Sequence, residues 1–198
     1  YANPTYRGVV FRYNLFRHVG NGGDGVHGQA AIRFDDAISG MLVYGNIFHR
    51  SANGNFGAVQ INSGRDNIIE NNIFADCKQG VSGGWRDGNA VWRDFERGTN
   101  PAFIMNDLYL SRYPDLMKLR EKPGFNYLWR NLFWNGGPVA TGNKAHLDLM
   151  ENAEYDGEDP GFADAAGGQF ALKRDAPVFG RIRDLFAQAP SSVERGYE

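Results

Sequence analysis

The chain has 198 residues, with 21 lysines and arginines against 23 aspartates and glutamates and a formal net charge of −2. This balance excludes the strongly basic surface that holds a nucleic-acid backbone or an anionic membrane, so we expect neither partner. A hydrophobic fraction of 42% is enough for one buried core, and the single cysteine excludes an intrachain disulfide. No apolar run is long enough to span a bilayer, so we expect no membrane insertion.

A short phrase recurs four times along the chain: asparagine, then leucine or isoleucine, then phenylalanine. The copies are Asn14-Leu15-Phe16, Asn46-Ile47-Phe48, Asn72-Ile73-Phe74 and Asn131-Leu132-Phe133. Their spacings are explained by a solenoid of about 25 residues per coil, with loops inserted in the wider intervals. Stacked coils would place the asparagines on top of one another, where their amides can hydrogen-bond, while the apolar residues fill the bore.

Second strands are predicted between the phrases, at 29–34 and 57–62, where apolar and polar residues alternate. Aligning Ile32 with the residue 27 positions later, Val59, puts Arg33 beside Gln60 and Asp35 beside Asn62 on one outer face. This alignment predicts a polar row along the solenoid.

The repeat divides the chain into four parts of one domain, residues 1–198. Residues 1–82 are predicted to form coils, 83–123 an inserted loop with short helices, 124–150 a further coil and 151–198 a segment that closes the last coil. Strand-like sequence begins almost at the first residue, so we expect further coils upstream of this chain.

Three phrases carry a resemblance to a known family: residues 32–36, 43–48 and 64–74. In them the chain resembles the right-handed parallel β-helix proteins of bacterial carbohydrate metabolism, the pectate-lyase-like and polygalacturonase-like superfamily. The resemblance implies an all-β, right-handed parallel β-helix, of which this chain is the C-terminal portion. It also implies a polysaccharide or oligosaccharide substrate and therefore a secreted or periplasmic protein, which we expect to be a monomer without a cofactor.

The adjacent residues Asp35 and Asp36 are the sharpest chemical signal. Glycosidases use two carboxyl groups, one protonated as acid and one ionised as base or nucleophile, and paired aspartates on a β-helix strand resemble those of polygalacturonase-type hydrolases. We therefore predict that Asp35 and Asp36 are catalytic. The alternative is that Asp36 caps a turn and that Asp35 forms a structural ion pair with Arg33.

Substrate-binding roles are predicted for seven further residues. Side chains of the outer face and its margins could contact sugar hydroxyls or charges, and tryptophans of the insertion could stack on sugar rings or only pack the insertion down. The predicted set is Arg33, His27, His49, Gln60, Asn62, Trp85 and Arg86. No calcium-binding repeat or metal-ligand spacing is present in the sequence, so we expect no obligatory metal.

Three functions remain open at this point. The leading hypothesis is a glycoside hydrolase that cleaves a plant or algal polysaccharide. A polysaccharide lyase would instead need a base and a cation that neutralises a uronate carboxylate, for which Arg33, Arg65 or Arg86 are candidates. A carbohydrate-binding or adhesive module would use the same outer face without breaking bonds.

Overall fold

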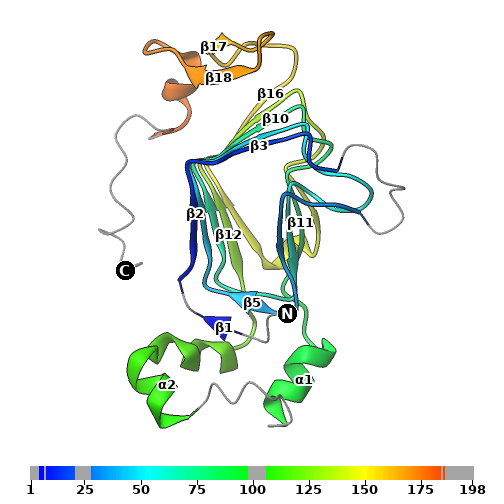
Figure 1. The fold of residues 1–198 in the computed structure, drawn as a ribbon, viewed down its shortest axis with the longest axis vertical. Helices are drawn as coiled ribbons and strands as arrows, with labels where there is room; N and C mark the ends of the chain where they lie inside the picture. Colours follow the sequence, from blue (N-terminus) through cyan, green and yellow to red (C-terminus); the bar gives the residue numbers. More distant parts are fainter. Residues whose placement is uncertain (1–4, 7, 21–27, 98–105, 184, 186–198) are drawn as a thin grey trace.

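The computed structural model describes residues 5–6, 8–20, 28–97, 106–183 and 185. Most of its strands belong to three parallel sheets that the chain visits in turn (Figure 1). The first sheet contains β2 (Val10–Arg12), β6 (Leu42–Tyr44), β9 (Ile68–Glu70), β12 (Asn126–Trp129) and β15 (Leu147–Met150). The second contains β3 (Leu15–Arg17), β7 (Ile47–His49), β10 (Ile73–Ala75), β13 (Leu132–Trp134) and β16 (Ala153–Tyr155). The third contains β4 (Ile32–Phe34), β8 (Val59–Asn62), β11 (Val81–Gly84) and β14 (Ala140–Gly142).

The register of the second sheet follows the sequence repeat. Each phrase contributes one strand, and Phe16, Phe48, Phe74 and Phe133 occupy paired positions in neighbouring strands. This in-register parallel pairing confirms the predicted parallel β solenoid. The solenoid also continues past residue 150, where the predicted further coil ends, because β16 pairs with β13.

A buried ladder of asparagines fixes this register. The Nδ2 group of each ladder residue donates to the Oδ1 atom of the next, at 2.9 Å from Asn14 to Asn46 and at 3.0 Å along the rest of the row. The successive members are Asn14, Asn46, Asn72, Asn131 and Asn152. Since a slip of one residue would leave these buried amides without partners, the ladder specifies how the coils stack.

Aromatic stacking fills the bore beside the ladder. The rings of Phe16, Phe48, Phe74 and Phe133 lie nearly parallel, with successive centroids 5.0, 4.8 and 4.7 Å apart. Aliphatic side chains of the first and third sheets pack against them in one core cluster. Burial of these apolar side chains from several coils is what holds the three sheets together.

Left-handed residues turn the chain from the first sheet into the second. Tyr13, Gly45, Asn71, Arg130 and Glu151 occupy this corner in successive coils, with φ between 51° and 66°. Four of them are not glycine, although this conformation is costly for other residues. The coil geometry therefore overrides the local backbone preference at this corner.

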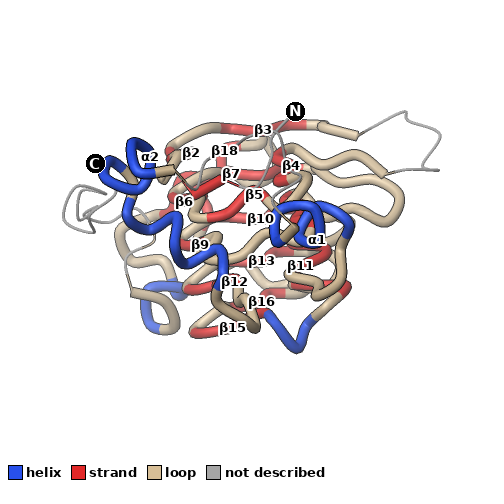
Figure 2. Tube along the Cα trace, turned by 90° about the horizontal axis from the view of Figure 1, so that it is seen from below, coloured by secondary structure: helices blue, strands red, loops and turns tan. Residues whose placement is uncertain are grey.

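The predicted insertion forms three short helices. They are α1 (Ala90–Glu96), α2 (Asp107–Arg112) and the 3₁₀ helix η1 (Pro114–Arg120). They lie beneath the corner between the third and first sheets, beside the paired strands β1 (Thr5–Tyr6) and β5 (Ile38–Ser39) (Figures 1 and 2). Trp85, Trp92, Leu116 and Leu119 anchor the insertion in a buried cluster around Ala37.

The C-terminal segment packs on the outer face of the second sheet. It contains the antiparallel strands β17 (Phe162–Asp164) and β18 (Gln169–Leu172) and the 3₁₀ helix η3 (Pro177–Gly180) (Figure 1). Its Phe162, Phe170 and Val178 share a buried cluster with outward residues of β10 and β13. The segment thus covers the side of several coils.

Between β14 and β15 lies one more short 3₁₀ helix, η2 (Lys144–His146).

No helix in the described ranges is long and apolar enough to cross a membrane.

Candidate functional site

A polar row runs along the outer face of the third sheet. Arg33, Gln60, Ser82 and Thr141 occupy paired positions on β4, β8, β11 and β14. The predicted alignment of Arg33 with Gln60 is therefore confirmed. The row is outward because a core residue stands directly before each member: Ile32, Val59, Val81 and Ala140.

A groove of about 550 Å³ lies along three members of this row, Gln60, Ser82 and Thr141. One side is formed by the loop between β7 and β8, which projects beside β11 in Figure 1, and another by the turn before β11. The lining residues that present side-chain chemistry include Asn55, Phe56, Gln60, Lys78, Gln79 and Arg86.

The groove is positively charged. Its described lining holds two cations, Lys78 and Arg86, and no carboxylate. Neither cation forms an ion pair within the part of the chain that the structure describes. A concave surface lined by charges of one sign concentrates ligands of the opposite sign, so the groove favours anions.

Two glutamines sit deep in the same groove. Gln60 and Gln79 are each 8% exposed. The Oε1 atom of Gln60 is shielded from solvent and has no hydrogen-bond partner among the described residues. The Oε1 atom of Gln79 accepts a hydrogen bond of 2.8 Å from the Thr141 hydroxyl. The Gln60 oxygen is therefore closed to a ligand in the groove, and the Gln79 oxygen is already bonded to Thr141.

Two glycines keep one end of the groove floor free of side chains. Gly83 and Gly142 line the groove with φ of 89° and 91°. A Cβ atom on Gly83 would lie 2.0 Å from the Ile61 carbonyl oxygen, and one on Gly142 would lie 2.8 Å from the Gly83 nitrogen. Only glycine fits both the conformation and the space.

Asp35, one of the two predicted catalytic residues, is held by its neighbours. One carboxylate oxygen forms an ion pair of 2.8 Å with Arg33. The other accepts hydrogen bonds from Asn62 Nδ2 at 2.7 Å and from the Asp36 backbone N–H at 3.1 Å. The predicted proximity of Asp35 to Asn62 is confirmed, and the pairing with Arg33 matches the structural alternative.

Asp36 lies in a turn. Its φ is 48°, and the following turn is closed by the Ile38 N–H, which donates to the Asp35 carbonyl oxygen at 3.2 Å. Left-handed turn positions favour aspartate because its short side chain can bond the local backbone. Neither aspartate is among the described residues that line the groove, although Arg33 lies 5.0 Å from the ring of Phe56, which does.

His49, predicted to bind substrate, is buried under the C-terminal segment. Its ring centroid lies 4.6 Å from that of Phe170, and its Nε2 atom lies 3.4 Å from the Asp76 carboxylate. Burial, followed by the positive charge of Arg50, lowers the pKa of His49 below its ordinary value. The residue belongs to the second sheet and is not part of the groove lining. The other predicted histidine, His27, lies outside the described residues.

The two tryptophans of the insertion pack it down. Trp85 and Trp92 are 5% and 3% exposed, and the indole N–H of Trp92 donates to the Ser63 carbonyl oxygen at 2.8 Å. Such burial leaves no ring face open for stacking on a sugar. Of the predicted residues in this region, Arg86 alone is both exposed and part of the groove lining.

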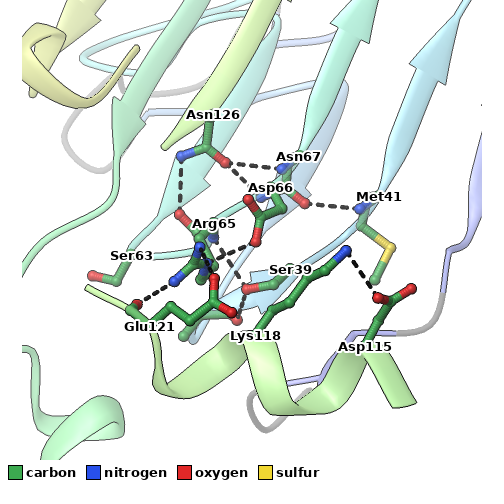
Figure 3. Close-up of polar contacts among 12 residues, drawn as sticks. Ser39, Met41, Ser63, Arg65, Asp66, Asn67, Asp115, Lys118, Glu121 and Asn126 are labelled. Atoms are coloured by element: carbon green, nitrogen blue, oxygen red, sulfur yellow. Dashed lines mark hydrogen bonds and ion pairs between the residues drawn. The ribbon is translucent and has the colours of Figure 1, made fainter. Parts of the chain in front are cut away.

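Arg65 ties the insertion to the solenoid (Figure 3). The buried guanidinium donates to Asp66 Oδ2 at 2.7 Å and to the Glu121 carbonyl oxygen, just past η1. Its Nη2 atom also lies 3.6 Å from the Glu121 carboxylate, and the Arg65 backbone N–H donates to Ser39 Oγ at 3.0 Å. This arginine, one candidate for a lyase, is thus committed to structure.

Among the groove residues that sequence reasoning missed are Asn55, Phe56, Lys78 and Gln79. They lie in loops between strands, where the side-chain alternation of a strand gives no direction. Lys78 and Gln79 could have been suspected from their position just before β11, whose Ser82 continues the polar row of Gln60.

The described residues contain no group of three histidine, cysteine, aspartate or glutamate side chains arranged to hold a metal ion. The fold and the groove define a parallel β solenoid with a cationic, amide-lined groove on one outer face. Comparison with protein-family models, with curated proteins and with solved structures finds no significant match to this chain.

Proposed function

We propose that this chain is a carbohydrate-acting, right-handed parallel β-helix whose groove binds an acidic polysaccharide. The observation that carries the proposal is the presence of Lys78 and Arg86 in a groove without a carboxylate in its described lining. Amides and hydroxyls beside these cations suit the many oxygens of a sugar chain. Right-handedness is the general rule for connections between parallel strands. Because polysaccharides are met outside the cytoplasm, we also propose a secreted or periplasmic location.

Among reactions, β-elimination on a uronate polymer is the one that the groove supports best. It requires a positive charge that neutralises the uronate carboxylate, so that the neighbouring proton becomes acidic enough to remove. Lys78 and Arg86 supply that charge. Hydrolysis by Asp35 and Asp36 is less well supported, because the Asp35 carboxylate is engaged by Arg33 and Asn62.

Binding is tested with the double variant Lys78→Ala/Arg86→Ala. We expect the wild type to bind an acidic polysaccharide such as polygalacturonate in a salt-dependent manner, and the variant to bind at least tenfold more weakly. The matched control is Lys173→Ala/Arg174→Ala, which removes the same charges from a different cavity, on the C-terminal segment, and should bind like the wild type. Equal binding by all three proteins would contradict the proposal.

The reaction is tested by following new reducing ends together with the ultraviolet absorbance of unsaturated uronate. Absorbance that grows with time indicates a lyase. Reducing ends without absorbance, lost in Asp35→Asn, indicate a hydrolase and refute the elimination. Binding without either product identifies a non-catalytic carbohydrate-binding module.

A further inference from the structure

Two kinds of polar side chain in the groove present hydrogen-bond donors: the cations Lys78 and Arg86 and the buried amides of Gln60 and Gln79. Lys78 and Arg86 have no acceptor atoms in their charged groups. The Nε2 atoms of Gln60 and Gln79 are open to solvent, and neither forms a hydrogen bond with another described residue. Each NH₂ group therefore reaches the groove with its hydrogen-bonding capacity unused.

The amide oxygens cannot compensate for these donors. The Oε1 atom of Gln79 is occupied by the Thr141 hydroxyl, and the Oε1 atom of Gln60 is shielded from solvent. A sugar hydroxyl can accept from one of these amides, but its own proton finds no acceptor on either glutamine, and a neutral oxygen receives weaker bonds than a charged one. A carboxylate or a sulfate ester accepts only, and its charge strengthens each bond it receives.

The Asp35 carboxylate, on the same side of the solenoid, does not oppose an anion. Asp35 accepts a hydrogen bond from Asn62, which lies two residues after Gln60 on β8, but its charge is balanced by Arg33 at 2.8 Å. The local field at the glutamines is consequently set by Lys78 and Arg86.

We propose that Gln60 and Gln79 form a metal-independent oxyanion subsite, which binds a carboxylate or sulfate group of the polysaccharide directly through N–H donors. The inference rests on the proposed function and deepens it: Lys78 and Arg86 attract the polymer, and the two buried amides select and position one charged group. Their burial makes them specific, because a group that enters without accepting their hydrogen bonds leaves them unpaired and desolvated.

The first test uses the wild-type protein in the presence of EDTA. Side-chain NH₂ resonances of Gln60 and Gln79 are followed by NMR during titration with galacturonate, inorganic sulfate and neutral galactose. We expect both resonances to shift with the two anions and not with galactose. Equal shifts with galactose, or no shift with either anion, would overturn the subsite. A response to only one anion still supports it and decides between a carboxylate and a sulfate.

The second test replaces each donor with an isosteric acceptor. Gln60→Glu and Gln79→Glu should each weaken polygalacturonate binding at least tenfold, while Gln169→Glu on β18, far from the groove, should not. The melting temperature of each glutamate variant is measured first, and only variants as stable as the wild type are compared in binding. If one of them does not fold, the NMR titration of the wild type remains decisive. Undiminished binding by both variants would refute the subsite.

These outcomes separate the subsite from the function on which it rests. Loss of polysaccharide binding on addition of EDTA would indicate a bridging cation and refute direct recognition by the amides. The proposed function would still stand in that case if Lys78→Ala/Arg86→Ala bound the acidic polysaccharide more weakly than the wild type. If the wild type binds no acidic polysaccharide at all, the proposed function itself fails.

Discussion

Truncation of Asn72, a central member of the asparagine ladder, should destabilise the solenoid strongly. Its Oδ1 atom accepts hydrogen bonds from the Asn46 backbone N–H at 2.9 Å and the Asn46 side chain at 3.0 Å. Its Nδ2 group donates to Val43 O, Glu70 O and Asn131 Oδ1 at 2.9 to 3.0 Å. All these groups lie in the interior, where water cannot replace the lost partner.

The expected cost of Asn72→Ala follows from the groups left behind. Each buried donor or acceptor without a partner costs about 1–3 kcal/mol, and the Asn46 N–H and at least one carbonyl oxygen are affected, so we expect about 2–6 kcal/mol. The control is Asn14→Ala, at the exposed end of the same ladder, where water can bond the freed groups and the cost should stay below about 1 kcal/mol.

Urea denaturation followed by circular dichroism measures both values. With a slope of about 2 kcal/mol per molar urea, Asn72→Ala should lower the midpoint by roughly 2 M and Asn14→Ala by less than about 0.5 M. Similar midpoint shifts in the two variants would show that burial of the ladder is not what makes it stabilising, and would refute the reasoning.

Three further predictions concern groups outside the groove. Because burial lowers the pKa of His49, the unfolded chain takes up a proton below about pH 6.5 that the folded state resists. Stability should therefore fall as the pH drops from 7 to 5, and His49→Gln should flatten this dependence in denaturant titrations; an unchanged slope would exclude His49 as the cause. Burial raises the pKa of the Cys77 thiol to about 12, so a thiol reagent at pH 8 should label it only after unfolding, and rapid labelling of the native protein would contradict its burial. Asp66→Asn weakens the ion pair with Arg65 and should speed proteolysis within residues 86–123, while Asp164→Asn, on the far side of the second sheet, should leave the rate unchanged.

The repeat in the sequence is enough to predict the solenoid and much of its register. Asn46 and Asn72 recur because a buried amide must meet the same amide in the next coil, and that requirement is visible as spacing alone. The alternation in residues 29–34 and 57–62 likewise places Arg33 beside Gln60, because neighbouring parallel strands present equivalent residues on one face. The fifth ladder member, Asn152, escaped notice since no phenylalanine follows it.

The groove and its chemistry were decided by the tertiary structure. Lys78 precedes β11 and Arg86 follows it, but a groove forms beside them only when the loop before β8 and the residues around β14 pack along the same sheet. Loops have no periodicity from which a side-chain direction follows. The burial of Trp85 beneath the insertion and of His49 beneath the C-terminal segment depends on contacts between residues far apart in the chain. Short-range pattern therefore determined which strands stack, while long-range packing determined which polar side chains remain open to a ligand.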